Sequence, residues 1–325
     1  MVMKNIEKRI FAINSNAEFE KIALEVFHIQ KERCTVYAQY VNSLNRKDPS
    51  NIQEIPFLPI SFFKTHEVKT INLPIEFEFL SSATTGLQRS RHLVQNKRMY
   101  ESSFEIIYRN FIGNPEDQVI LALLPNYLEQ GNSSLVYMVE KLIQLSKNSL
   151  SGFFLNDYSK LIESYKIAVK NNKKVIVFGV SYALLDLAEM NIDFSKAKVI
   201  ETGGMKGRRK EMTKDELHLK LTEGLRLDAI SSEYGMTELF SQSYSDKNGL
   251  FEMPPWMQIL IRETNDPFHY VEDGKTGGIN IIDLANLYSC SFIETQDLGQ
   301  RLGNDFKLMG RFDNSDIRGC NLMVE

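Results

Sequence analysis

The sequence predicts an α/β fold with a largely parallel sheet, and the middle of the chain carries the prediction. Short apolar runs alternate there with helix-length amphipathic segments. The runs lie at residues 119–124, 175–178, 199–200 and 229–230. The helix-length segments lie at residues 134–146, 157–171 and 181–190. Apolar runs stopped by Pro, Gly or Ser and spaced by helices are typical of β-α-β units.

The C-terminal part has a different pattern. From Trp256 onward, strand-like segments at residues 257–261, 278–283 and 290–294 are separated by turn residues such as Asp273 and Gly274. This alternation predicts an antiparallel or barrel-like end rather than further β-α-β units. No repeat or low-complexity linker marks a domain boundary.

The N-terminal segment predicts a helix. Ser15 followed by Glu18 is a capping-box pattern, and apolar residues then recur on one helical face, which we interpret as core packing. The members of this stripe are Phe19, Ile22, Ala23, Val26 and Phe27. Four prolines between residues 48 and 75 predict irregular loops and short strands in that stretch.

Composition excludes several classes of protein. The chain has 325 residues, 38 Lys plus Arg and 42 Asp plus Glu, so its formal net charge is −4 and we expect no nucleic-acid partner. Hydrophobic residues make up 43% and charged residues 25%, which is ordinary globular usage. Three cysteines without a CxxC pair predict neither a disulfide framework nor structural zinc. Without a secretory h-region or an apolar span, we expect a cytoplasmic protein with no membrane span.

The first candidate site is the segment SSATTG at residues 81–86, followed by Arg89 and Arg91. Small-residue loops with hydroxyl side chains can wrap a phosphate chain, and arginines supply charge-assisted hydrogen bonds. The alternative is a flexible polar loop, because Ser, Thr and Gly are ordinary loop residues.

A second candidate is the segment YGMTE at residues 234–238, which follows the apolar run at 229–230. It offers an aromatic ring for a base, a glycine for close approach, a hydroxyl for a phosphate oxygen and a carboxylate for Mg²⁺. The alternative is a loop-to-helix turn in which Thr237 or Glu238 only caps the helix.

Two further segments lie near strand ends. The glycine-rich stretch at 202–207 lacks the GxGxxG spacing, so NAD binding is discounted, and residues 274–276 predict a hairpin turn rather than a Walker A loop. Asp297 and Arg311 could bind a ribose and a phosphate, or belong to turns. The five histidines show no triad spacing and are interpreted as structural.

In this order the motifs resemble the adenylate-forming superfamily of acyl-CoA synthetases, luciferases and peptide-synthetase adenylation domains. Within it, the chain is similar to the acyl-protein synthetase family, which includes the synthetase subunit of the bacterial luminescence fatty acid reductase. That closer resemblance is carried by FLPISFFK at 57–64, LPNYL at 124–128, SEYGMTEL at 232–239 and IRGCNLM at 317–323. It implies an adenylate-forming large-domain fold, with parallel sheets flanked by helices and an antiparallel C-terminal subdomain.

The resemblance also implies an ATP site and a reaction. The ATP phosphates would be bound by Ser81, Ser82, Thr84, Thr85, Gly86 and Arg89. Adenine would lie against Gly203 and Gly204 and stack on Tyr234, beside Gly235. Thr237 would contact the α-phosphate, Glu238 would coordinate Mg²⁺, and Asp297 and Arg311 would bind the ribose. A carboxylate, expected to be that of a fatty acid, would attack the α-phosphate to give an acyl-adenylate and pyrophosphate.

The chain departs from the family pattern at three points. Ala83 stands where the phosphate loop usually has glycine, and the part before the loop, about residues 1–75, is reduced. The chain ends twelve residues after Asp313, the expected hinge. We therefore expect a large domain at 1–310 and a hinge with a short tail at 311–325, with the small C-terminal domain absent or vestigial.

Cys320 is the candidate acyl acceptor. The family resemblance implies acylation of a cysteine near the C-terminus and transfer to a reductase partner, whereas the alternative is an inert thiol. The predicted activity is thus an ATP- and Mg²⁺-dependent acid–thiol ligase acting on Cys320 or a partner protein. Two alternatives are a phenylacetate-type acyl-CoA ligase and a non-catalytic nucleotide- or acyl-binding subunit of a reductase complex.

Overall fold

The computed structural model describes residues 2–82, 88–124, 132–203, 212–246 and 248–312. They belong to two compact units, one formed by Ile75–Gly249 and the other by Met1–Pro74 together with Leu250–Glu325. The predicted β-α-β segments lie in the first unit, and the strand-like segments from Trp256 onward lie in the second.

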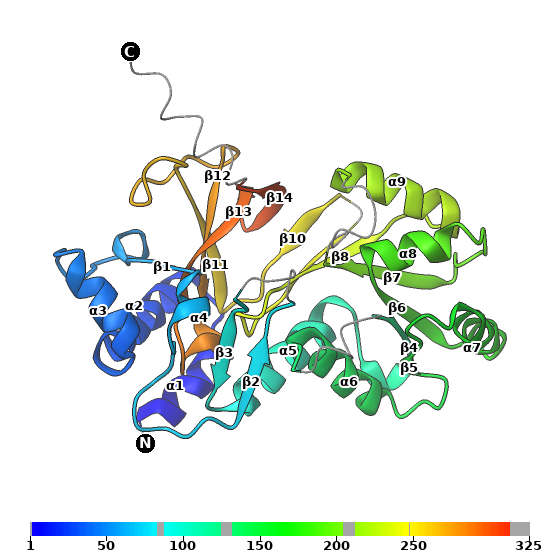
Figure 1. Cartoon of the computed structure of the whole chain (residues 1–325), viewed down its shortest axis with the longest axis horizontal. Coiled ribbons are helices and arrows are strands. Elements are labelled where there is room, and N and C mark those ends of the chain that lie inside the picture. The colour runs from blue at the N-terminus through cyan, green and yellow to red at the C-terminus, as the bar shows by residue number, and fades with distance from the viewer. Residues whose placement is uncertain (1, 83–87, 125–131, 204–211, 247, 313–325) are drawn as a thin grey trace, which may run out of the picture. The chain divides into compact units, whose positions relative to one another are not determined.

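The unit Ile75–Gly249 is built on a mostly parallel sheet with strand order β9-β8-β7-β6-β4-β5, in which only β9 is antiparallel to its neighbour (Figure 1). The strands are β4 (Gln118–Leu123), β5 (Gly152–Phe153), β6 (Lys174–Val180), β7 (Ala197–Thr202), β8 (Ser231–Tyr234) and β9 (Ser243–Ser245). The helices are α5 (Lys97–Phe111), α6 (Ser134–Ser146), α7 (Tyr158–Lys170), α8 (Ser181–Ala188) and α9 (Lys214–Leu225). Helices α5 and α6 lie on one face and α7, α8 and α9 on the other, as right-handed crossovers require (Figure 1).

The strands of this sheet confirm the predicted α/β class. Every residue of β4 is buried. Parallel strands covered on both faces appear as continuous apolar runs, which explains the run at 119–124. The predicted helix at 134–146 coincides with α6, whose first turn is capped by the Ser133 hydroxyl. The run at 229–230 precedes its strand, because β8 pairs with β7 only from Ser231 onward.

A separate hairpin completes this unit. Strands β2 (Phe77–Leu80) and β3 (Arg91–Val94) pair antiparallel, from Phe77 opposite Val94 to Leu80 opposite Arg91. The predicted phosphate-binding segment joins the two strands, so the hairpin positions both of its ends. The short 3₁₀ helix Pro115–Asp117 leads into β4.

The other unit contains an antiparallel sheet of order β11-β12-β13-β14-β10, as the C-terminal pattern predicted. Its strands are β10 (Leu250–Glu252), β11 (Met257–Arg262), β12 (Thr276–Asp283), β13 (Phe292–Leu302) and β14 (Asp305–Arg311). The short strand β1 (Leu58–Pro59) pairs parallel with β13. The helices are α1 (Val2–Ile10), α2 (Asn16–Arg33), α3 (Thr35–Ser43) and α4 (Phe62–Thr65), with 3₁₀ turns at Ile52–Glu54 and Leu284–Asn286. The stretch 48–75 therefore contains short elements, as its prolines indicate.

Helix α2 confirms the predicted N-terminal helix. The Ser15 hydroxyl accepts the Glu18 N–H, and all five predicted stripe residues are buried. The Glu18 carboxylate, however, accepts from the Asn14 N–H at 3.2 Å rather than from the Ser15 N–H. The complete capping box is at Thr213 and Glu216, at the start of α9, where the sequence analysis did not place one.

Gln30 of α2 is a polar residue on this buried face. Its amide nitrogen donates to the carbonyls of Asn286 and Leu287 and to the Ser291 hydroxyl, and its oxygen accepts the Ser291 N–H at 2.9 Å. These four hydrogen bonds of one buried side chain fasten α2 to the segment before β13. Losing them would be strongly destabilising, because the amide would be left buried without partners.

The described residues include no helix that is long and apolar enough to cross a membrane. Cys34 and Cys290 are buried free thiols, and burial raises the pKa of each. Cys320 lies outside the described residues.

Candidate functional site

The ends of the predicted phosphate-binding segment are closed by three hydrogen bonds. The Ser81 N–H donates to the Ser90 carbonyl at 3.0 Å, and the Ser90 N–H donates back to the Ser81 hydroxyl at 2.8 Å. Arg89 Nε donates to the Ser81 carbonyl at 2.6 Å. Ser81, Ser82 and Arg89 thus lie at the base of the segment. Thr84, Thr85 and Gly86, together with Ala83, lie outside the described residues.

The second motif forms the end of β8 and the turn that follows it. Tyr234 is the last residue of β8 and is buried, Gly235 is exposed, and Glu238 is buried within the turn. The predicted alternative, a helix cap at Thr237 or Glu238, is not found, because the chain continues from this turn into β9 without a helix.

His92 on β3 connects this turn to the hairpin. Its Nδ1 donates to the Thr237 carbonyl at 2.9 Å, and its ring stacks on Phe240 with centroids 4.5 Å apart. Complete burial lowers the pKa of His92 to about 4, so the imidazole is neutral at physiological pH. His92 was predicted to be structural, but the contact itself could not be predicted because Thr237 is 145 residues away in the sequence.

Two glycines of the predicted site have identifiable steric or backbone roles. A Cβ at position 235 would lie 2.3 Å from Glu233 Oε1, so a larger residue there would require the Glu233 carboxyl group to shift. Gly203 follows β7 with φ of 75°, a left-handed conformation that glycine adopts readily. Its carbonyl accepts a hydrogen bond from the Ser181 hydroxyl at 3.2 Å. Gly204 lies outside the described residues.

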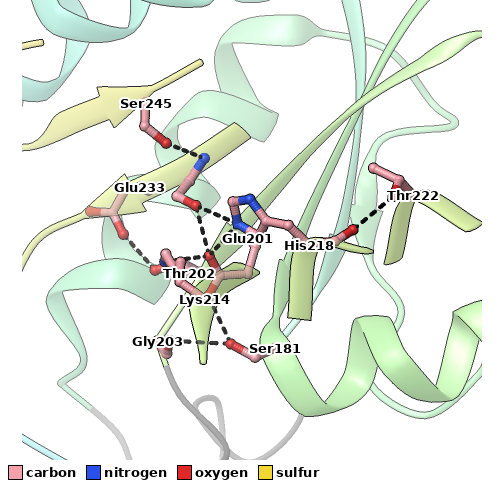
Figure 2. A network of polar contacts seen from close by, with 10 residues as sticks. Ser181, Glu201, Thr202, Gly203, Lys214, His218, Thr222, Glu233 and Ser245 are labelled. Carbon is pink, nitrogen blue, oxygen red and sulfur yellow. Dashed lines mark hydrogen bonds and ion pairs between the residues drawn. The ribbon is translucent and has the colours of Figure 1, made fainter. Parts of the chain in front are cut away.

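Glu201, near the end of β7, is the centre of a buried polar network (Figure 2). Its carboxylate accepts from Ser181 at 2.8 Å, Ser232 at 2.9 Å and Lys214 Nζ at 2.7 Å, and His218 Nε2 lies 3.9 Å away. Burial by itself would raise the pKa of Glu201, but the interactions with His218, Lys214 and Ser181 lower it to about 2. The network therefore joins α8, α9, β7 and β8 around an ionised carboxylate.

Glu233 on β8 is a second buried carboxyl group, and its pKa is shifted in the opposite direction to that of Glu201. Its Oε2 accepts from the Thr202 hydroxyl at 2.5 Å (Figure 2). Burial raises its pKa to about 7, and the negative charge of Glu201 adds to the shift. Neither carboxylate was predicted from the sequence, although each lies within the last residues of a strand, next to a predicted motif.

We expect Glu233 to make folding stability fall as pH rises from about 4.5 to 7. The folded state holds this proton more tightly than the unfolded chain, so its stabilising contribution is complete below the ordinary pKa and is lost as pH passes through the raised one. Glu233→Gln should flatten this slope. Urea unfolding of the wild type and the variant at pH 5, 6 and 7.5 measures this slope. The same slope in both proteins would contradict its assignment to Glu233.

Asp297 and Arg311 are brought together in the other unit. They are opposite one another on β13 and β14, and Arg311 Nε donates to Asp297 Oδ1 at 2.9 Å. The Asp297 carboxylate is largely buried, whereas the Arg311 side chain is 72% exposed. The alternative that these are turn residues is wrong, because both lie in strands. Asp313, the predicted hinge, lies outside the described residues.

The turn after β8 carries one carboxylate that could take part in a metal site. In the described part of the chain, no three His, Cys, Asp or Glu side chains are placed to form a metal cluster. Mg²⁺ commonly binds one or two carboxylates together with substrate phosphates. Glu238, next to Thr237, offers one such carboxylate.

Solved structures of similar fold include MatB proteins and a CoA ligase. An ATP-bound RpMatB-BxBclM chimera matches with a TM-score of 0.57 and 15% identity over 74% of this chain and 50% of its own. ATP-bound MatB from Rhodopseudomonas palustris matches with a TM-score of 0.56, 15% identity and the same coverage. A 2-hydroxyisobutyryl-CoA ligase in an open conformation with 2-HIB-AMP and CoA matches with a TM-score of 0.66 and 12% identity, covering 93% of this chain and 72% of that ligase. The chain thus spans about half the length of the MatB structures.

These likenesses place the protein in the adenylate-forming fold class. The family model of the acyl-protein synthetases, LuxE, matches residues 12–325, so the chain belongs to that family. A search of curated protein sequences found no match. The predicted fold class and the predicted family resemblance are both confirmed.

Proposed function

We propose that the protein is an ATP- and Mg²⁺-dependent acid–thiol ligase. It activates a carboxylic acid, which we propose to be a fatty acid, as an acyl-adenylate and transfers the acyl group to a protein cysteine. The observation that supports this most directly is the His92 contact, which holds the Thr237 carbonyl against the hairpin bearing the phosphate-binding segment. Family membership and the ATP-bound structures of similar fold support the same activity.

In the proposed first step, a carboxylate oxygen of the acid attacks the α-phosphorus of ATP, and the bond to pyrophosphate breaks. Ser81, Ser82, Thr84, Thr85, Gly86 and Arg89 bind the phosphates, while Gly203, Gly204, Tyr234 and Gly235 bind adenine. Thr237 binds the α-phosphate, and Asp297 and Arg311 bind the ribose. Glu238 would hold Mg²⁺, which would supply positive charge for the leaving pyrophosphate, and the residues contribute mainly by positioning and electrostatics.

In the second step, the proposed Cys320 thiolate attacks the acyl carbonyl, and AMP leaves with the bonding electrons. The product is a thioester, from which a reductase or another acceptor protein could take the acyl group. A second candidate acceptor is coenzyme A, since a ligase of similar fold has been solved with CoA bound.

Acid-dependent pyrophosphate release from Mg-ATP, measured over a panel of carboxylic acids of increasing chain length, tests the proposal. We expect a chain-length optimum and a covalent acyl adduct that is lost in Cys320→Ser. Cys34→Ala is the matched control, because Cys34 is buried and should leave the adduct intact. An adduct that persists in Cys320→Ser would assign the acceptor role to another residue. Turnover only with CoA would assign it to CoA. ATP binding without release on any acid would favour the non-catalytic alternative.

A further inference from the structure

A row of polar side chains crosses one face of the parallel sheet beside the predicted nucleotide motif. Thr202 on β7 is in register with Glu233 on β8, which is in register with Tyr244 on β9. Side chains in register on neighbouring strands lie on the same face, about 5 Å apart. Glu201, one residue before Thr202, therefore belongs to the opposite face with Ser232 and its network.

Two members of this region have unsatisfied hydrogen-bonding capacity. Within the described part of the chain, the Tyr244 hydroxyl and Gln242 Oε1 are buried and have no hydrogen-bond partner. Both residues are only 4% exposed. Buried polar groups in folded proteins are nearly always paired, so these two atoms are available to hydrogen-bond a further group.

Glu233 and Gln242 approach the nucleotide motif directly. A Cβ built on Gly235 would lie 2.3 Å from Glu233 Oε1 and 3.4 Å from Gln242 Cγ, so both side chains flank this glycine. Gly235 is two residues before Thr237, the predicted α-phosphate contact. In parallel sheets ligands bind at the carboxyl ends of the strands, which is where β7 and β8 end here.

We propose that Glu233, Gln242 and Tyr244 bind a hydroxyl group of the acid substrate, so that the enzyme activates a hydroxylated fatty acid in preference to the unsubstituted acid. The inference rests on the proposed function and narrows its substrate class. The acid must bring its carboxylate to the α-phosphate, which places its first carbons near Thr237 and hence near Gly235.

The chemistry of the three side chains matches a hydroxyl group. A hydroxyl both donates and accepts, so it can donate to Gln242 Oε1 or Glu233 Oε1 and accept from the Tyr244 O–H. An ammonium group fits less well, because burial raises the pKa of Glu233 and keeps this carboxyl group neutral below about pH 7. An unbranched alkyl chain would leave the Tyr244 hydroxyl and Gln242 Oε1 without partners.

The test compares kcat/KM for pyrophosphate release on acids of one chain length: unsubstituted, 2-hydroxy, 3-hydroxy and 2-amino. We expect one hydroxy acid to exceed the unsubstituted acid by at least tenfold. Tyr244→Phe and Gln242→Leu should each reduce this preference toward one. Because the Tyr244 hydroxyl has no partner in the described part of the chain, Tyr244→Phe should keep the wild-type Tm or raise it.

Tyr108→Phe is the matched control. The Tyr108 hydroxyl donates to Gln118 Oε1 at 2.6 Å, so its removal should lower Tm while the hydroxy-acid preference stays unchanged.

A preference that survives in both Tyr244→Phe and Gln242→Leu would overturn the inference and assign these groups to bound water. Release that is equal or faster on the unsubstituted acid, or fastest on the amino acid, would overturn it while leaving the proposed ligase activity intact. Release on no acid would remove the proposed function and this inference together.

Discussion

Glu238→Gln is expected to lower acid-dependent pyrophosphate release by about 100-fold or more. The substitution keeps the size and shape of the side chain but removes the charge proposed to hold Mg²⁺ at the turn after β8, and loss of one such electrostatic contact typically has an effect of about 10² to 10³ on kcat. Glutamine has almost the same volume as glutamate, so the change should leave the packing around this buried position unaffected. Initial rates over a Mg²⁺ titration at saturating ATP and acid measure the effect.

Glu223→Gln provides the control for this variant. Glu223 is an exposed residue of α9 in the same unit, and its replacement should leave both rate and Mg²⁺ dependence unchanged. If Glu238→Gln retained the wild-type rate within about threefold at every Mg²⁺ concentration, the metal-binding role of Glu238 would be wrong.

Glu201→Gln is expected to reduce the free energy of unfolding by about 3 kcal/mol, because breaking a buried ion pair leaves its partners unsatisfied. The partners are Lys214, Ser181 and Ser232, which all donate to this carboxylate. The lowered pKa of Glu201 gives the sign of the pH dependence. Its stabilising contribution is present above the ordinary value of 4.5 and is lost as pH falls toward 2, so the variant should show a weaker loss of stability in acid.

Glu116→Gln is the control that separates the effect of burial on stability from the effect of a lowered pKa. The pKa of Glu116 is also lowered to about 2, by hydrogen bonds from Arg109, but this pair is on the surface, where solvent screens it. Its loss should change the free energy of unfolding by less than about 1 kcal/mol. Equal effects of the two substitutions in urea titrations at pH 7 would contradict the buried-network interpretation.

The strands and helices that the sequence predicted well are those with strong local signals. The run at 119–124 became β4, and the segment at 134–146 became α6 with unchanged limits. β13 was predicted too short. It runs through Asp297 to Leu302, because pairing with β12 and β14 outweighs the turn preference of Asp and Gly.

The sequence by itself determined the fold class, the family and the order of the nucleotide motifs, because buried parallel strands and clustered motifs are local properties of the chain. Only the tertiary structure decided what surrounds those motifs. The contact of His92 with Thr237 and the opposite protonation of Glu201 and Glu233 depend on strand register and on which face of the sheet each residue occupies. A shift of one residue would exchange those faces, and no local pattern specifies which helix covers them.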